Sequence, residues 1–250
     1  MSGVDDMRPT IRDKWPCWVF DLYGTLVDIL TDEEDPALWE QTARYLSLAG
    51  RPWTPAALRR AYRKACAEAE RRLGDPLGEI DIVPVWARLA ETDPAEAERI
   101  ALLFRALSIR RLRCFAHAKE LTAALRRKGR TVILLSNAQA AFTRPELRLL
   151  GLEDCFDAVF LSSECGVGKP SPAFFRKVTD LGFAPRDCVM VGNDDVCDCR
   201  GAAEAGMDSM YLRTEQSPRP AGRLPDNCVR VRGLREILAA AEGNEREEER

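Results

Sequence analysis

Four groups of polar side chains in this chain have the types and the spacing that a chemical site needs. They are Asp21, the pair Ser136-Asn137, Lys169, and the cluster Asn193-Asp194-Asp195 with Asp198 one helical turn later. Carboxylates that gather in one place are costly unless they share a hard cation, and oxygen ligands of this kind suit Mg²⁺. The set therefore predicts attack of Asp21 on phosphorus to form an aspartyl phosphate, with Mg²⁺ and Lys169 offsetting the oxyanion charge.

Three apolar runs of strand type lead to these polar groups, over residues 15–20, 131–135 and 188–191. The carboxyl ends of parallel strands lie on one edge of a sheet, and open α/β sheets bind their ligands there. Gly24 supplies the conformational freedom that a tight turn after Asp21 requires. The polar groups are therefore expected to converge on one crevice, to which Lys169 adds a positive charge from a loop.

The remaining pattern divides the chain into two kinds of segment. Residues 37–113 are dominated by helix formers with Pro and Gly punctuation, and they predict four or five helices and no convincing strand. From Cys114 onward, strand-like and helical runs alternate, which is typical of a parallel sheet wrapped by helices. The predicted helices cover residues 118–128, 145–150, 173–181 and 198–205, and the further strands cover 158–161, 208–212 and 229–231.

Two short segments have a composition of their own. Residues 29–35 are acidic and polar and end at Pro36, which suits a hinge before a helix. The tail 242–250 is almost entirely charged and predicts disorder.

Composition argues against several classes of partner. The net charge is −3 with both signs intermixed, so no basic stripe supports nucleic-acid binding. No apolar run approaches the roughly 20 residues that a membrane span needs, and residues 1–14 lack the apolar centre of a signal peptide. These features predict a cytoplasmic protein without a membrane partner, and they leave its oligomeric state open.

The nine cysteines are scattered, and several lie inside apolar runs, which favours reduced and buried thiols. Cys197-Asp198-Cys199 contains the only close pair. It leaves a thiolate metal site open as an alternative, although no second cluster supplies the remaining ligands.

From Trp15 to about Leu238 the chain resembles the haloacid dehalogenase superfamily of aspartate-nucleophile hydrolases. The resemblance rests on four motifs in order, at residues 20–26, 135–137, 168–175 and 191–207. It implies a Rossmann-like α/β core formed by residues 1–30 and 115–250. It also implies an all-helical cap, residues 31–114, inserted after the first strand and closing over the crevice.

The resemblance also implies a role for each site residue. Asp21 would be the nucleophile and a Mg²⁺ ligand, with the backbone carbonyl of Tyr23 as a second ligand. Thr25, Ser136 and Asn137 would hold the transferring group, and Lys169 would pair with that group and with Asp21. In the last motif one alignment puts Asn193 at the acidic position. Shifted by one residue, the motif makes Asp194 the main ligand, and Asp198 acts behind the direct ligands or through a water.

Two departures from the family pattern keep three functions open. Tyr23 stands where phosphatases carry an acid for the leaving group, and a phenol with a pKa near 10 is a poor substitute. Dehalogenases carry a Tyr there, yet they lack the acidic residues of the last motif. The first expectation is a Mg²⁺-dependent phosphatase of a small phosphorylated metabolite, best with aryl or acyl phosphates. The alternatives are a metal-free 2-haloacid dehalogenase acting through an aspartyl ester and a weakly active binding or regulatory protein.

Overall fold

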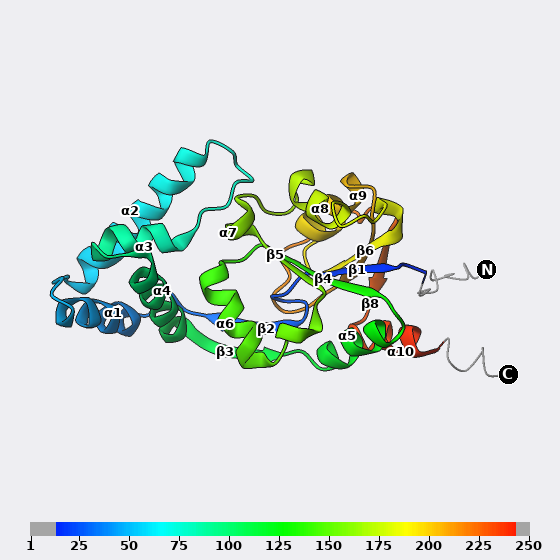
Figure 1. The fold of residues 1–250 in the computed structure, drawn as a ribbon, viewed down its shortest axis with the longest axis horizontal. Coiled ribbons are helices and arrows are strands. Elements are labelled where there is room, and N and C mark those ends of the chain that lie inside the picture. Colours follow the sequence, from blue (N-terminus) through cyan, green and yellow to red (C-terminus); the bar gives the residue numbers. More distant parts are fainter. Residues whose placement is uncertain (1–13, 244–250) are drawn as a thin grey trace, which may run out of the picture.

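A parallel six-stranded sheet organises residues 14–243, which are the residues that the computed structural model describes (Figure 1). The strand order is β5-β4-β1-β6-β7-β8. The strands are β1 (Cys17–Phe20), β4 (Thr131–Ser136), β5 (Ala158–Leu161), β6 (Cys188–Gly192), β7 (Asp208–Leu212) and β8 (Cys228–Val231). Phe20 is in register with Leu134 on one side and Val191 on the other. The ends of β1, β4 and β6 therefore lie side by side, as the sequence predicts.

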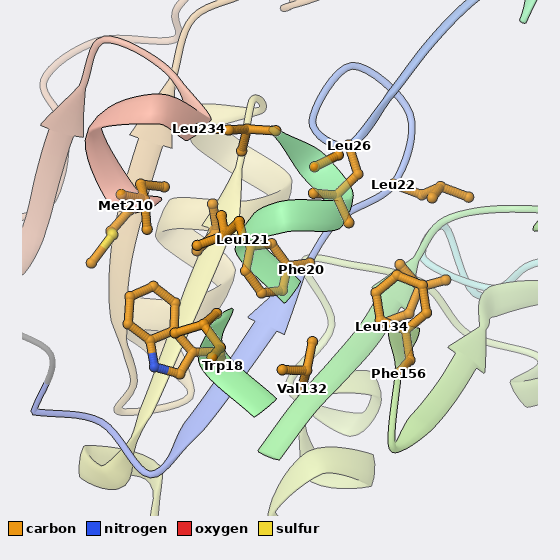
Figure 2. Packing of buried hydrophobic residues seen from close by; sticks show 14 of the residues in the cluster. Trp18, Phe20, Leu22, Leu26, Leu121, Val132, Leu134, Phe156, Met210 and Leu234 are labelled. Carbon is orange, nitrogen blue, oxygen red and sulfur yellow. The ribbon is translucent and has the colours of Figure 1, made fainter. Parts of the chain in front are cut away.

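Helices cover both faces of the sheet because alternate residues of its buried strands point to opposite sides. Trp18 and Phe20 pack on one face with residues of α5 (Ala118–Arg127) and α10 (Leu234–Gly243), as Figure 2 shows. Cys17 and Val19 pack on the other face, against α8 (Pro172–Thr179) and α9 (Gly201–Glu204). The sheet and its two helical layers confirm the α/β Rossmann-like fold, with a helical insertion after the first core strand.

Four helices of the insertion form a second hydrophobic core of their own. They are α1 (Pro36–Leu48), α2 (Pro55–Leu73), α3 (Ile82–Ala90) and α4 (Pro94–Ser108). Each begins at a side-chain cap, from Asp35, Thr54, Asp81 and Asp93 respectively. Their interior is an aromatic cluster of Trp39, Tyr62, Trp86 and Phe104.

Two predictions about the segments that join the insertion to the core were partly wrong. Residues 29–31 belong to a strand rather than a hinge, and residues 109–113 belong to a strand where none was predicted. β2 (Val27–Thr31) pairs antiparallel with β3 (Ile109–Cys114), so a two-stranded sheet links the insertion to the core. Because β3 contains three arginines, its sequence resembles the polar end of a helix more than a strand. Two of them, Arg111 and Arg113, bind the buried carboxylate of Asp28 across the pair.

Several helix boundaries also differ from those predicted. α6 (Ala140–Leu150) begins five residues before Pro145, which lies inside the helix rather than at its start. The segment between β5 and Lys169, for which no helix was predicted, contains a short one, α7 (Ser162–Cys165). The helix expected over 198–205 is a π-helical turn, Asp195–Arg200, followed by α9.

The structure describes the chain from residue 14 to residue 243. Residues 1–13, where the sequence indicates no signal peptide, lie outside the described residues. Of the tail predicted to be disordered, Glu242 and Gly243 end α10 and residues 244–250 lie outside. Within residues 14–243, no helix has the length and apolar character to cross a membrane.

The cysteines are all free thiols. Cys199 is buried and Cys197 is half-buried beside it in sequence. Among residues 14–243 there is no group of three or more His, Cys, Asp or Glu side chains that could hold a metal ion, so the thiolate site finds no support.

Candidate active site

A buried ion triad lies at the end of β1. The Nζ atom of Lys169 is 2.8 Å from Oδ1 of Asp21 and 2.7 Å from Oδ1 of Asp198. Lys169 is 5% exposed, Asp21 8% and Asp198 1%. Burial alone would lower the pKa of the Lys169 ammonium, but Asp198 and Asp21 outweigh it and raise that pKa above its usual value. Lys169 is therefore a fixed cation beside the predicted nucleophile.

Asn137 holds the main chain of Lys169 with both ends of its amide. Its Oδ1 accepts from the Lys169 backbone N–H at 2.7 Å, and its Nδ2 donates to the Lys169 carbonyl at 2.9 Å. The sequence predicts that Asn137 holds the transferring group. In this structure its amide holds the backbone of Lys169, and its contact with a transferring group stays a prediction. Ser136 is buried at the end of β4, next to this pair.

Thr25 and Asn193 lie on the other side of the Asp21 carboxylate. The Thr25 hydroxyl lies 3.0 Å from Oδ2 of Asp21 and 3.2 Å from Oδ1 of Asn193, to either of which it can donate. Gly24 allows this approach, because its φ is +81° and a Cβ there would lie 2.3 Å from Nδ2 of Asn193. Thr25 thus lies between the Asp21 carboxylate and the Asn193 amide, and its predicted role in holding the transferring group stays a prediction.

The π-helical turn assigns different tasks to the three aspartates after Asn193. Oδ1 of Asp194 accepts from the N–H groups of Val196 and Cys197 at 2.8 and 2.9 Å and caps the turn. Asp195 accepts from the Ala221 N–H at 2.8 Å. Oδ2 of Asp198 accepts from the Asp194 N–H at 2.9 Å, so both of its oxygens are engaged.

Tyr23 is held by residues that sequence reasoning did not single out. Its hydroxyl donates to Oε2 of Glu146 and lies 3.0 Å from the Thr143 hydroxyl. Arg105 of α4 binds Oε1 of Glu146 at 2.6 Å and lies over the Tyr23 ring.

The environment of this phenol decides its protonation state. Burial, with the charge of Glu146 adding to it, raises the pKa of the Tyr23 phenol above its usual value, although Arg105 opposes the shift. The phenol is therefore neutral at pH 7, and its proton is used in the bond to Glu146.

The oxygen donors on and next to Asp21 are of the kinds that Mg²⁺ binds while it keeps several of its waters. Asp21 supplies a carboxylate, and the Tyr23 carbonyl accepts no hydrogen bond from any residue in the described range. Asn193 and Asp194 add an amide and a carboxylate oxygen next in sequence. Mg²⁺ is commonly held by one or two carboxylates with carbonyls, waters and substrate phosphate. Both oxygens of Asp198 accept hydrogen bonds, from Lys169 and from the Asp194 N–H, and its part in a metal site stays a prediction.

Three residues of the site carry no signal in the sequence. Asn193, by contrast, was expected there, because it directly follows the apolar strand β6, which ends at Gly192. Arg105, Thr143 and Glu146 lie inside helices, and Glu146 is 123 residues from Tyr23, a separation that no local spacing reveals.

Comparison with known proteins matches most of the chain to one family. The model of the haloacid dehalogenase-like hydrolases matches residues 17–206. The phosphoserine phosphatase of Thermus thermophilus is 35% identical over 132 residues, which are 52% of this chain and 52% of that protein. The human N-acylneuraminate-9-phosphatase is 30% identical over 112 residues, 44% of this chain and 45% of that protein. The chain thus spans about half the length of the curated relatives it matches.

Solved structures of the same fold include both phosphatases and dehalogenases. A HAD phosphatase from Thermococcus onnurineus superposes with a TM-score of 0.60 at 21% identity, covering 88% of this chain and 95% of that one. The 2-haloacid dehalogenase of Pseudomonas syringae superposes with a TM-score of 0.61 at 24% identity, covering 89% and 97%. At these identities the likeness concerns the fold and does not separate the two chemistries.

Proposed function

The chain belongs to the haloacid dehalogenase-like hydrolases, and we propose that it is a Mg²⁺-dependent phosphatase of a small phosphorylated metabolite. The observation that carries this proposal is the Asp21 carboxylate held between Lys169 and Thr25. The sequence relatives named as phosphatases support phosphoryl rather than halide chemistry. The helical insertion would serve as the cap over this site.

In the proposed reaction one oxygen of Asp21 attacks phosphorus, the bond from phosphorus to the leaving oxygen breaks, and an aspartyl phosphate forms; the leaving group departs as an oxyanion, which takes a proton from solvent. Water then attacks this phosphorus and loses a proton to solvent, the bond from phosphorus to Asp21 breaks, and phosphate and the Asp21 carboxylate are released. Lys169 holds a positive charge beside the developing oxyanion, and Thr25 orients the carboxylate. Asp21, the Tyr23 carbonyl and Asn193 or Asp194 would hold Mg²⁺, which when bound supplies further positive charge to the phosphate oxygens.

Removal of the metal gives the first test. With a chelator, turnover of an aryl phosphate is expected to fall to background and to return when Mg²⁺ is added, because Asp21 and the phosphate are both anionic. The measurement is release of the phenol under both conditions, with Asp21→Asn as the blank. Phosphate release that persists in chelator would contradict the proposal.

Tyr23 gives a second test, because its proton is committed to Glu146. Tyr23→Phe is expected to lower kcat for an aryl phosphate by less than about tenfold, whereas loss of a working general acid costs about 10²- to 10⁴-fold. Tyr23→Asp, which places a carboxyl group at this position, should raise kcat for alkyl phosphates more than kcat for aryl phosphates. A hundredfold loss in Tyr23→Phe at unchanged melting temperature would instead make the phenol the acid.

Metal-free dehalogenation of a 2-haloacid is the second candidate, and Asn193 is the observation that favours it. An amide beside Thr25 brings less negative charge than the Asp of a metal site would, and Tyr23 is also the dehalogenase residue at its position. Halide leaves without a proton, so the committed phenol would cost this reaction nothing. Halide release from 2-chloropropionate in the presence of chelator would select this function and reject the phosphatase.

A further inference from the structure

Gln139 is a polar residue next to the site that the proposed reaction does not use. It precedes α6, but its amide forms no hydrogen bond to that helix. The amide reaches the chain between α2 and α3 instead. Its Oε1 accepts from the Ile82 N–H at 2.9 Å, and its Nε2 donates to the Ile80 carbonyl at 2.8 Å and to Oε1 of Glu79 at 2.9 Å. All the hydrogen bonds of this side chain thus go to one segment of the insertion, residues 77–82.

The 77–82 segment also pairs with the loop that carries Lys169, residues 166–169. Gly78 and Val167 form an antiparallel bridge. The Gly168 N–H donates to the Leu77 carbonyl at 3.0 Å, and the Glu79 N–H donates to the Gly166 carbonyl at 3.2 Å. In Figure 1 the cyan chain between α2 and α3 lies beside α7, where this loop begins.

The 166–169 loop is held from the core side as well. Asn137 holds Lys169, and Gly168 packs so closely on the Asn137 amide that a Cβ would lie 2.7 Å from its Oδ1. Gly168 is thus held between Asn137, from the end of β4, and Leu77, from the insertion. Gln139 follows Asn137 by two residues and fixes the far end of the same segment.

We propose that Gln139 is a positioning residue, which fastens the 77–82 segment over the 166–169 loop and thereby seats the Lys169 ammonium between Asp21 and Asp198. Its amide donates and accepts like a peptide group, so it pairs with the segment as a strand would. The position of the Lys169 ammonium would then depend partly on the helical insertion. The effect on turnover rests on the proposed function, but the placement of the loop does not.

Hydrogen–deuterium exchange of the full chain tests this placement without any substrate. In Gln139→Ala, peptides covering 77–82 and 166–169 should both exchange about tenfold faster, because three hydrogen bonds are lost and the second segment is held by the first. Gln216→Ala is the matched control: it removes another half-buried glutamine, bonded to Asp28 at 2.7 Å, and should change neither peptide. Gln139→Glu is a second variant, which places a carboxylate against the carboxylate of Glu79 and so replaces a hydrogen bond with repulsion.

Each outcome decides the proposal. Faster exchange in 77–82 alone would overturn it, because the segment would then be fastened without positioning the Lys169 loop. Unchanged exchange in both peptides, or an equal increase in β1, would also overturn it. Where an aryl phosphate is turned over, kcat should fall about tenfold in Gln139→Ala with a smaller change in KM. A wild-type chain without phosphatase activity would refute the proposed function and leave the exchange result standing.

Discussion

Replacing Asp21 by Asn should lower kcat/KM for an aryl phosphate by at least about a thousandfold, because the amide cannot form the aspartyl phosphate. The melting temperature should change little. Thr25 can still donate to the amide oxygen, and Lys169 keeps Asp198 as its counter-ion. The measurement is initial-rate kinetics with purified variant, together with mass spectrometry of acid-quenched wild-type enzyme for the phosphorylated aspartate.

Asp28→Asn provides the matched control for this prediction. Asp28 is as buried as Asp21 and is bound by Arg111 and Arg113, but it lies on β2, away from Lys169. Its replacement should lower the stability more than the turnover. If Asp21→Asn retained a tenth of the wild-type activity, Asp21 would not be the nucleophile, and the proposed chemistry would fail for phosphate and haloacid alike.

The arrangement of the core could be predicted because its signals are local. The runs that become β1, β4 and β6 are continuous and apolar, as strands buried on both faces must be, and each ends on a polar group. The parallel sheet then brings those ends together without further information. Lys169 lies on a loop, so its pairing with Asp21 was expected from the family resemblance rather than from the sheet, and their side chains lie 2.8 Å apart.

The parts that the sequence did not reveal depend on contacts between distant segments. The pairing of β2 with β3 joins residues about 80 positions apart. The arginines of β3, whose sequence is typical of a solvated helix end, bind one buried carboxylate. The commitment of Tyr23 to Glu146 is equally non-local. For Asn193 and Asp194 the difficulty is different, because shifting the alignment of the last motif by one residue exchanges their expected roles. The structure separates them: Asp194 caps the π-helical turn, and Asn193 contacts Thr25.

Lys169→Met is expected to have the second large effect, on both stability and turnover. The variant removes the one cation between the Asp21 and Asp198 carboxylates, and Asp198 is only 1% exposed. Breaking a buried pair from one side costs about 3–5 kcal/mol of unfolding free energy, because the remaining charge stays desolvated. Loss of a charge that stabilises an oxyanion should lower kcat/KM by about 10²- to 10³-fold. Denaturant unfolding without added metal and steady-state kinetics measure the two effects.

A second substitution separates the two roles of Lys169. Adding Asp198→Asn to Lys169→Met removes the carboxylate that has no access to water, so most of the lost unfolding free energy should return. Turnover should stay low, because Asp21 and the substrate still lack their cation. Recovery of turnover together with stability would mean that Lys169 serves only to neutralise Asp198. Recovery of stability alone places the ammonium in the reaction itself, which the 2.8 Å contact with Asp21 leads us to expect.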